Sequence, residues 1–517
     1  MSRPSVHGPG ADTASGPHGT TARGPRGGAP GRRAVLGLGA GAALASVPVG
    51  APSASARPAG ARGFDPRPGA PGVGDPLFPT LGNGGYQVDH YDLTFDFTPV
   101  TYDLTGTIRI SAHATQDLSS FNLDTDGHTI DAVTVNGRRA AWALSEGQSG
   151  QELTVTPAAP LHNGAGFTTQ IRYHGNGKAP RSGLSGWVFG ADGGFACAAQ
   201  SSRADTFFPC NDTPSDKATW TFHISAPEGY VATANGRLTH KTRRADDRTV
   251  WHFALAERMA TELCGIAVVR GTYLYGASHR GLPLRHVVPL GEEDAYAPVV
   301  ARTADHLAWL EAKFGPYPFS LYGLHIYGGY TDALENQTLT LMGTNWFKPD
   351  AQGHPAWENT MVHELTHQWW GDSVTPKDWQ QAWLNEGPAT YYAALYGEEH
   401  GWSSMAATME KTYRGLDAVR AKDGPPGLPN ALGGTNIYDG GALVLYALRL
   451  RVGGPAFDRI MLNWPRLHRD SNVTSEDFIR HAVATGRDAS LDPFLRAWLF
   501  APANPPMPGH PEWSATA

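Results

Sequence analysis

Two histidines four residues apart constrain this chain more than any other feature. His363 and His367 enclose Glu364 in the string H-E-x-x-H, and residues four apart lie on one face of a helix. Two imidazoles one helical turn apart can bind one metal ion. Glu386 follows His367 after eighteen intervening residues, at the expected start of another helix. Two histidines and one carboxylate leave a fourth zinc position open for water, which is typical of a catalytic site.

Glu364 lies on the adjoining face of the same helix, from which it does not reach the metal. A carboxylate beside an open metal site is suited to take a proton from water, so Glu364 is the predicted general base. A lone H-E-x-x-H also occurs on ordinary helices with a polar surface. Glu386 at ligand spacing, followed by an apolar helical pattern, favours the metal site.

The stretch HELTHQWWGDSVTPKDWQQAWLNEGPATYY, residues 363–392, resembles the gluzincin aminopeptidases related to aminopeptidase N and leukotriene hydrolase. The signature of that family is H-E-x-x-H-x-W-x-G-N-x-V-T followed by W-L-N-E-G. The resemblance implies one Zn²⁺ per chain, bound by His363, His367 and Glu386.

Two positions in this stretch depart from the family pattern. Asp372 replaces the usual Asn, and Pro388 replaces the usual Phe. Proline is tolerated in the first turn of a helix, so Pro388 is compatible with a helix that begins near Leu384. The ligand set is unaffected by either change.

A second motif lies upstream of the histidines. An aminopeptidase needs a carboxylate that pairs with the substrate's α-ammonium at a fixed distance from the metal. Residues 331–337, TDALENQ, are similar to the family motif G-A-M-E-N, which implies that Glu335 is this anchor and that Ala333 lies on an extended segment able to pair with substrate. Asp332 replaces the family's Gly, and a solvated or helix-capping glutamate is the alternative. The position of Glu335, 28 residues before His363, favours the anchor.

The stretch AAQSSRADTFFPCNDTPSDK, residues 198–217, resembles a β-domain segment of the same family. The match implies that Gln200 helps to hold the N-terminal residue of the substrate. Asp205 stands where the family has Arg.

Residues 436–442, NIYDGGA, resemble the family's Y-x-K-G-A, with Gly440 in place of Lys. The match implies that the Tyr438 hydroxyl donates a hydrogen bond to the oxyanion of the transition state. The alternative is an ordinary tyrosine before a helix. Its position 52 residues after Glu386 favours the catalytic role.

The fold class expected is α+β. Residues 80–272 show apolar and polar residues in alternation, as at 91–97, and predict an antiparallel β-domain of saddle or sandwich form. Asn136-Gly137 and Asn235-Gly236 lie between such runs and favour tight hairpins.

Residues 273–505 are expected to form a mainly α-helical, thermolysin-like zinc catalytic domain, with 506–517 as a tail. The helical pattern begins near Pro298 and predicts a helix that Gly315-Pro316 ends. Further helices are predicted at 441–451, 457–464 and 492–500. Family members usually carry another helical domain, so the chain is expected to be a short form with a more open cleft.

Residues 1–56 are expected to be an export signal, and 57–79 a linker. Arg32-Arg33 precede an apolar run at 34–47, too short to span a bilayer, and Ala54-Ser55-Ala56 form an A-x-A cleavage signal. The paired arginines favour twin-arginine export, and a disordered tail is the alternative. The mature protein is expected to be secreted, with no stable membrane insertion.

The three cysteines have no zinc-binding spacing. In an oxidising compartment Cys197 and Cys210 could form a disulfide, leaving Cys264 buried and free. The net charge of −7, without a basic stripe, gives no support for nucleic acid as a partner.

The function predicted is that of a secreted zinc aminopeptidase, with peptides that have a free N-terminus as substrates. Two alternatives are a zinc endopeptidase with an open cleft and a non-catalytic peptide-binding protein. Glu335 argues against the first, and the intact set of ligands, base and tyrosine argues against the second.

Overall fold

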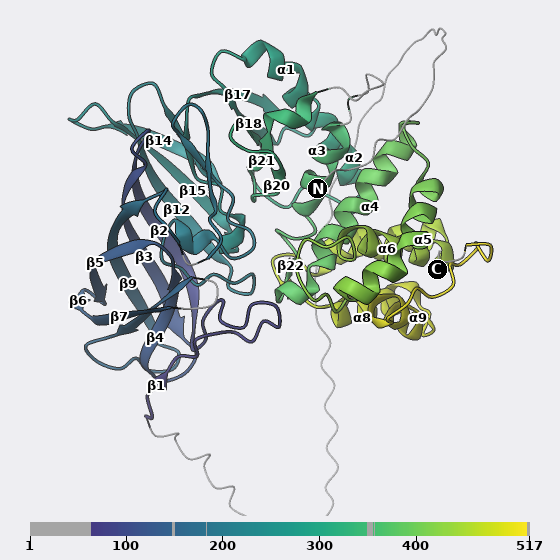
Figure 1. Ribbon diagram of the computed structural model, residues 1–517, viewed down its shortest axis with the longest axis horizontal. Helices are drawn as coiled ribbons and strands as arrows, with labels where there is room; N and C mark the ends of the chain where they lie inside the picture. The colour runs from purple at the N-terminus through teal and green to yellow at the C-terminus, as the bar shows by residue number, and fades with distance from the viewer. Residues whose placement is uncertain (1–63, 147–149, 182, 349–354, 356, 514–517) are drawn as a thin grey trace, which may run out of the picture. The chain divides into compact units, whose positions relative to one another are not determined.

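The computed structural model describes residues 64–146, 150–181, 183–348, 355 and 357–513. The described residues from Asp65 onward belong to one compact unit. The expected export signal at 1–56 and the first part of the linker lie outside the described residues. Figure 1 shows the β-rich part of the chain, in purple and blue, followed by helices in green and yellow.

A large sheet forms the base of the N-terminal domain, and in the described residues it has eight strands in the order β14-β15-β12-β2-β3-β9-β5-β6. Burial alternates along β2, where the four apolar side chains of 91–97 are all buried, as the alternation predicts. The bounds are β2 (Tyr86–Thr98), β3 (Asp103–Ala114), β5 (His128–Val135), β6 (Arg138–Arg139), β9 (Gly166–Asn176), β12 (Ala218–Ala226), β14 (Arg237–Arg243) and β15 (Thr249–Met259).

Two smaller sheets complete this domain. One contains β1 (Arg67–Pro68), β4 (Leu118–Thr125), β7 (Ala141–Glu146) and β8 (Gln151–Thr156). The other contains β10 (Trp187–Phe189), β11 (Phe195–Cys197), β13 (Val231–Thr233) and β16 (Ala267–Val269). The ring of Phe97 from β2 lies 4.5 Å from that of Phe195 in β11, so the sheets share one apolar core.

The expected α+β class is confirmed, but the N-terminal domain is not purely antiparallel. Strands β2 and β12 pair in parallel, with Phe95 opposite Ile224. The chain between them forms β3, β5, β6 and β9 of the same sheet and several strands of the two smaller sheets before it reaches β12. Local alternation of apolar residues does not encode this crossover, because strand direction depends on the connection.

One of the two predicted hairpins is wrong. Asn136-Gly137 joins the paired strands β5 and β6, with both residues at positive φ. Asn235-Gly236 instead connects β13 to β14, which belong to different sheets. The Asn235 side chain is buried, donates to the carbonyls of Leu263 and Gln337 at 2.9 and 2.6 Å, and so joins the two domains.

The catalytic domain begins with a sheet of five strands among the residues described, in the order β17-β18-β19-β21-β20. The bounds are β17 (Gly271–Ala277), β18 (Pro283–Pro289), β19 (Leu324–Tyr327), β20 (Ala333–Leu334) and β21 (Thr340–Gly343). The short pair β22 (Thr375–Pro376) and β23 (Asn472–Val473) lies farther along the chain. The predicted domain boundary at 272/273 falls inside β17.

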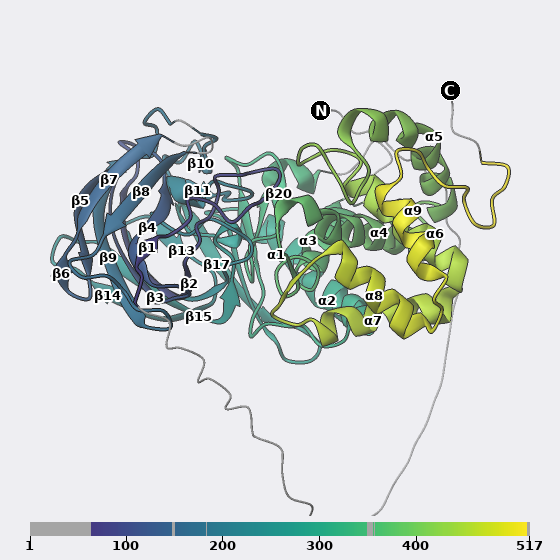
Figure 2. The ribbon, with the colours of Figure 1, turned by 90° about the horizontal axis from the view of Figure 1, so that it is seen from below.

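Helices make up most of the rest: α1 (Glu293–Ala301), α2 (Thr303–Phe314), α3 (Trp357–His367), α4 (Trp383–Glu399), α5 (Met405–Asp423), α6 (Tyr438–Val452), α7 (Gly454–Leu467), α8 (Ser475–Gly486) and α9 (Leu491–Phe500). The helices predicted at 441–451, 457–464 and 492–500 correspond to α6, α7 and α9. Gly315 ends α2 as predicted, whereas Pro298 lies inside a separate helix, α1. Figure 2 shows α3, α4 and α6 near one another, and α4 contacts both of the others.

The cysteine prediction needs a correction. Cys197, Cys210 and Cys264 are all buried and free, so the disulfide considered between Cys197 and Cys210 is absent. Cys197 ends β11, which pairs with β16, and its thiol interacts with that of Cys264, which lies shortly before β16.

The expected linker and tail both contact the folded domains where they are described. Strand β1 pairs with β4, and Asp75 accepts a hydrogen bond from the backbone N–H of Trp379 at 2.7 Å. At the other end, the ring of Trp513 stacks on Tyr446 of α6. The described parts of the linker and of the tail are therefore packed against the folded domains.

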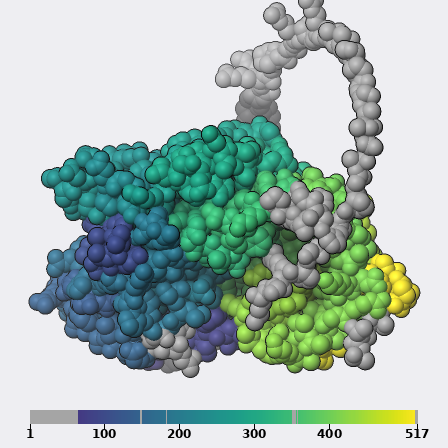
Figure 3. Space-filling view, turned by 45° about the horizontal axis from the view of Figure 1, so that its top comes forward, coloured from purple at the N-terminus to yellow at the C-terminus, as the bar shows by residue number. Residues whose placement is uncertain are grey.

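Each domain has a core of its own. In the space-filling view the blue residues of the β-domain and the green and yellow residues of the helices occupy separate regions (Figure 3). Most buried apolar residues divide in the same way into a β-domain cluster and a helical cluster, and a third, smaller cluster joins β11 and β16 to strands of the five-stranded sheet. Among the described residues, every helix is too short or too polar to cross a membrane.

Candidate active site

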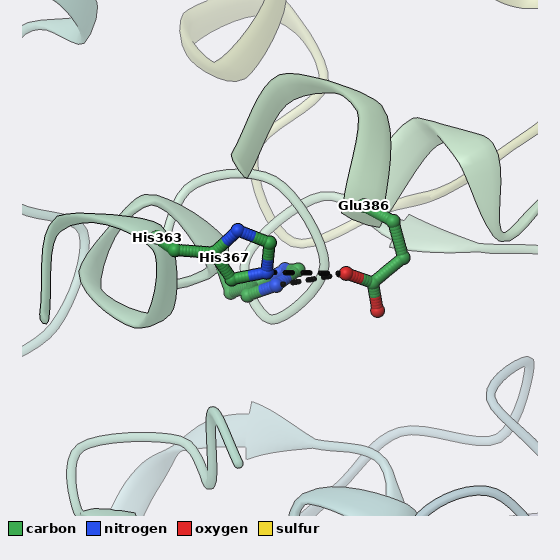
Figure 4. Close-up of side chains that lie close together, drawn as sticks. All are labelled: His363, His367 and Glu386. Atoms are coloured by element: carbon green, nitrogen blue, oxygen red, sulfur yellow. Dashed lines mark ion pairs between the residues drawn. The ribbon is translucent and has the colours of Figure 1, made fainter. Parts of the chain in front are cut away.

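Helix α3 presents the two histidines. The Nε2 atoms of His363 and His367 lie 3.3 and 3.4 Å from the same oxygen, Oε2 of Glu386 in the first turn of α4. Figure 4 shows both imidazoles facing this carboxylate. Among the described residues, these three form one of two groups whose ligand atoms all lie within 4.8 Å of one another.

The spacing of these atoms fits a tetrahedral zinc site. With ligand bonds of about 2.0–2.1 Å, neighbouring ligand atoms of a tetrahedron lie about 3.3–3.4 Å apart. Nδ1 of His367 donates to the carbonyl of Trp370 at 3.2 Å, which leaves the lone pair of Nε2 for a metal. Burial acts to raise the pKa of Glu386, but the two histidines outweigh it and lower this pKa to about 2. The ligand is therefore an anionic carboxylate.

Helices α4 and α6 bring Tyr438 to the predicted metal ligands. Glycines allow the close approach: a Cβ added to Gly387 would lie 2.9 Å from Cα of Gly441. Tyr438 is the first residue of α6, and its ring is nearly parallel to that of His363, with centroids 6.2 Å apart. The carboxylate of Glu386, and then burial, raise the pKa of the Tyr438 hydroxyl well above its usual range. The hydroxyl therefore keeps its proton and can donate it in a hydrogen bond.

Glu364 lies on α3 next to the first histidine and is buried. Glu335, Glu364 and His367 form the second group of potential ligand atoms within 4.8 Å of one another. Burial, and next the charge of Glu335, raise the pKa of Glu364 well above its usual range. A carboxylate with a raised pKa is a stronger base, as general-base chemistry requires.

Glu335 and Gln200 come from different domains and meet in the site. Nε2 of Gln200 donates to Oε1 of Glu335 at 2.6 Å, and the carboxylate of Glu335 is buried. The backbone of Glu335 is fixed by Gln368, whose Nε2 donates to its carbonyl at 2.9 Å. Gln368 also accepts from the backbone N–H of Thr338 at 2.9 Å.

Ala333 lies in β20, at the edge of the five-stranded sheet, where it pairs with Met342 of β21. The other side of β20 carries no strand among the residues described. This placement agrees with an extended segment that can receive another strand. Asp332 is exposed, and its carboxylate accepts the N–H of Ala333 at 3.0 Å.

The predicted site residues therefore come together, but sequence reasoning missed two neighbours and misplaced one proline. Gln368 directly follows His367 and could have been found as part of that string. Glu262, which contacts Gln200, has no motif around it. Pro388 lies in the second turn of α4, not in the first, because the helix begins at Trp383.

Comparisons with known proteins agree with this arrangement. Residues 87–263 match the peptidase M1 N-terminal domain, and residues 300–498 match the peptidase family M1 domain. Leukotriene A-4 hydrolase from Xenopus laevis is 25% identical over 459 residues, which are 81% of this chain and 71% of that protein. Leucine aminopeptidase 2 from Aspergillus niger is 25% identical over 343 residues, 60% of this chain and about half (52%) of the fungal protein.

Solved structures extend the match to both domains together. A variant of an M1 zinc metallopeptidase from Deinococcus radiodurans, bound to a Tyr-Ser-Ala substrate, is 30% identical with a TM-score of 0.72. The match covers 85% of this chain and 100% of that one. A two-domain M1 zinc metallopeptidase bound to L-arginine is 29% identical with the same TM-score of 0.72, over 84% of this chain and 99% of that chain. The chain belongs to peptidase family M1 and is a zinc metallopeptidase.

Proposed function

We propose that this protein is an aminopeptidase that removes N-terminal residues from peptides with a free amine. The observation that carries the proposal is the pair formed by Glu335 and Gln200 beside the metal triad. Glu335 and His367 offer ligand atoms within 4.8 Å of each other, and Gln200 contacts the Glu335 carboxylate. A buried carboxylate this close to the metal can hold an α-ammonium so that only the first peptide bond reaches the catalytic groups.

The residues around the triad have complementary roles in this proposal. One Zn²⁺ bound by His363, His367 and Glu386 would supply a Lewis acid that acidifies water and polarises the substrate carbonyl. Glu364 accepts the proton of the attacking water and returns it to the leaving amine. The Tyr438 hydroxyl donates to the developing oxyanion, where the hydrogen bond is strongest in the transition state.

The edge strand completes the substrate site. An extended peptide can pair with the backbone of Ala333, which aligns its first peptide bond along β20. The complex of the Deinococcus radiodurans relative with Tyr-Ser-Ala supports peptides as the substrate class.

The decisive experiment uses one fluorogenic peptide in two forms, with a free and with an acetylated N-terminus. The full chain loaded with zinc is expected to release residues stepwise from the free form alone. Glu335→Gln is expected to reduce cleavage of the free form by roughly 10²-fold or more, since a charge-assisted hydrogen bond to the ammonium is lost.

Two other outcomes of this experiment would identify one of the two alternative functions. Equal cleavage of both forms would identify an endopeptidase and remove the anchoring role of Glu335. Zinc bound at one per chain without cleavage of either form, across a panel of N-terminal residues, would identify a peptide-binding protein.

We also propose that the protein is exported with removal of residues 1–56. The paired Arg32-Arg33, the apolar run and the A-x-A signal support this proposal. N-terminal sequencing of protein from the culture medium is expected to begin at Arg57. Replacement of both arginines by lysine is expected to retain the protein inside the cell if the twin-arginine route is used, whereas unchanged export would exclude that route.

A further inference from the structure

The amide of Gln200 bridges two buried carboxylates. Its Nε2 donates to Oε1 of Glu335 at 2.6 Å and lies 3.4 Å from Oε2 of Glu262, its second acceptor. An amide nitrogen carries two hydrogens, so both are directed at carboxylates. The remaining polar atom of the side chain, Oε1, is an acceptor only.

The short turn that carries Glu262 is buried and hydrogen-bonded to its surroundings. Glu262 lies in the 3₁₀ turn η2 (Thr261–Leu263), shortly before β16, and is 1% exposed. The adjacent Thr261 donates from its hydroxyl to Asp212 at 2.6 Å. Strand β11, which leads to Gln200, is joined to the same region by the hydrogen bond from Cys197 N to Ile266 O at 2.9 Å. The contact between Gln200 and Glu262 therefore belongs to the β-domain alone.

Glu262 has no other hydrogen-bond partner in the part of the chain that the structure describes. Its Oε1 is buried and unpartnered there, while Oε2 faces Gln200. A buried carboxyl group is costly unless its interactions compensate. The proposed mechanism does not use the Glu262 carboxyl group. Its burial beside Glu335 and Gln200, the residues proposed to bind the substrate amine, therefore requires another reason.

We propose that Glu262 is a positioning residue that orients the amide of Gln200 toward the substrate's α-ammonium. With Nε2 held by two carboxylates, Oε1 of Gln200 is left to accept a hydrogen bond from the ammonium that Glu335 binds. An amide turned the other way would direct N–H groups at a cation and repel it. This inference rests on the proposed aminopeptidase function, and it adds a residue that selects a charged amine.

The chemistry of Glu262 predicts which substitutions are tolerated. Burial, and next the charge of Glu335, raise the pKa of Glu262 well above its usual range, which favours its neutral form. Glutamine has the same size and keeps a carbonyl oxygen as acceptor for Nε2 of Gln200. Methionine has a similar length but lacks such an oxygen.

The test compares Glu262→Gln and Glu262→Met in the full, zinc-loaded protein, with Glu228→Gln as a control at an exposed site of the same domain. Glu262→Met is expected to raise KM for free-amine peptides roughly tenfold, the equivalent of one hydrogen bond, with kcat changed less than threefold. Glu262→Gln and the control are expected to stay within about threefold of the unmodified protein in both constants.

A double-mutant cycle tests whether Glu262 acts through Gln200. In a Gln200→Leu background, Glu262→Met is expected to have little further effect on KM, because the side chain that it orients is absent. Additive losses would overturn the proposal. An equal loss in Glu262→Gln and Glu262→Met would also overturn it, since charge and not orientation would then be the cause. Glu262→Ala replaces the methionine variant if circular dichroism shows that the latter does not fold.

Binding measurements separate this inference from the proposed function. If the unmodified protein cleaves no peptide, the aminopeptidase proposal fails, but calorimetric titration with phenylalanine amide still reports on the amine site. Weaker binding of this probe by Glu262→Met, with Glu262→Gln unchanged, supports the positioning role. Equal binding by all three proteins, or no binding by the unmodified protein, overturns it.

Discussion

Gly387 in α4 and Gly441 in α6 are in backbone contact: a Cβ added to Gly441 would lie 2.7 Å from Cα of Gly387. This contact sets the distance between the helix that carries Glu386 and the helix that begins with Tyr438. Any side chain at either glycine must therefore separate a metal ligand from the predicted oxyanion donor.

Gly441→Ala is expected to lower both stability and activity. Overpacking of this kind costs about 1–3 kcal/mol of unfolding free energy, and the displaced Tyr438 should lower kcat. Urea unfolding and peptide cleavage measure the two effects. Gly454→Ala, at the start of α7 with no atom near its added Cβ, is the matched control and should be close to neutral. Full activity of Gly441→Ala would show that the helix contact does not position Tyr438.

Glu364→Gln should keep zinc and lose nearly all turnover. The amide preserves the size of the side chain but cannot accept a proton, and general-base catalysis contributes about 10²–10⁴-fold to such reactions. Zinc per chain, measured by mass spectrometry of the metal, should stay at one while kcat falls by that factor. A variant with undiminished kcat would remove Glu364 from the role of base.

Tyr438→Phe should act on kcat with KM nearly unchanged. The hydroxyl is expected to bind the oxyanion, which exists only in the transition state, and loss of one such donor costs about 10²–10³-fold in rate. Steady-state kinetics with a free-amine peptide make the distinction. A change confined to KM would place Tyr438 in substrate binding instead.

Asp372→Asn should stabilise the protein. Asp372 is fully buried, and neither carboxylate oxygen has a hydrogen-bond partner among the described residues. Burial, and next the charge of Glu335, raise its pKa well above the usual range. Because the neutral amide avoids this cost, the unfolding free energy should rise by about 1–2 kcal/mol. The check is a higher urea midpoint with an unchanged denaturant dependence, and a lower midpoint would contradict it.

Much of this site could be read from sequence because its chemistry depends on short spacings. His363 and His367 are one helical turn apart, so a helix alone brings them together. Glu386 requires only that α4 pack against α3, which the apolar pattern after it already indicates. The alternation at 91–97 likewise predicts a strand, because side-chain direction in a strand is a local property.

Features that depend on distant chain segments could not be predicted in the same way. The parallel pairing of β2 with β12 is determined by a crossover of over a hundred residues. Asn235 resembles a hairpin residue locally, yet its side chain donates hydrogen bonds to the backbone carbonyls of Leu263 and Gln337. Glu262 has no motif, and its contact with Gln200 exists only because β11 and β16 are neighbours in one sheet.

Helix α3, which carries the two predicted histidine ligands, is also attached to its surroundings by a buried carboxylate. Glu358, in the first turn of α3, accepts hydrogen bonds from Arg302 at 3.0 Å, from His306 at 3.0 Å and from the hydroxyl of Tyr396 at 2.9 Å. Arg302 lies directly before α2, His306 lies in α2, and Tyr396 lies in α4. Burial acts to raise the pKa of Glu358, but the hydrogen bonds from His306 and Arg302 outweigh it and lower the pKa to about 2.

Glu358→Gln should therefore destabilise the protein at neutral pH and less so in acid. Loss of hydrogen bonds to a charged group costs about 2 kcal/mol. A carboxylate with a depressed folded pKa stabilises fully above its unfolded value of 4.5 and loses this contribution as pH falls toward 2. The difference in unfolding free energy between the two proteins should thus shrink between pH 4.5 and pH 2, although acid releases the metal from both. Glu476→Gln, which affects an exposed pair with Arg496, is the control and should cost under about 1 kcal/mol. A difference that stays constant with pH would show that Glu358 is not the group that titrates.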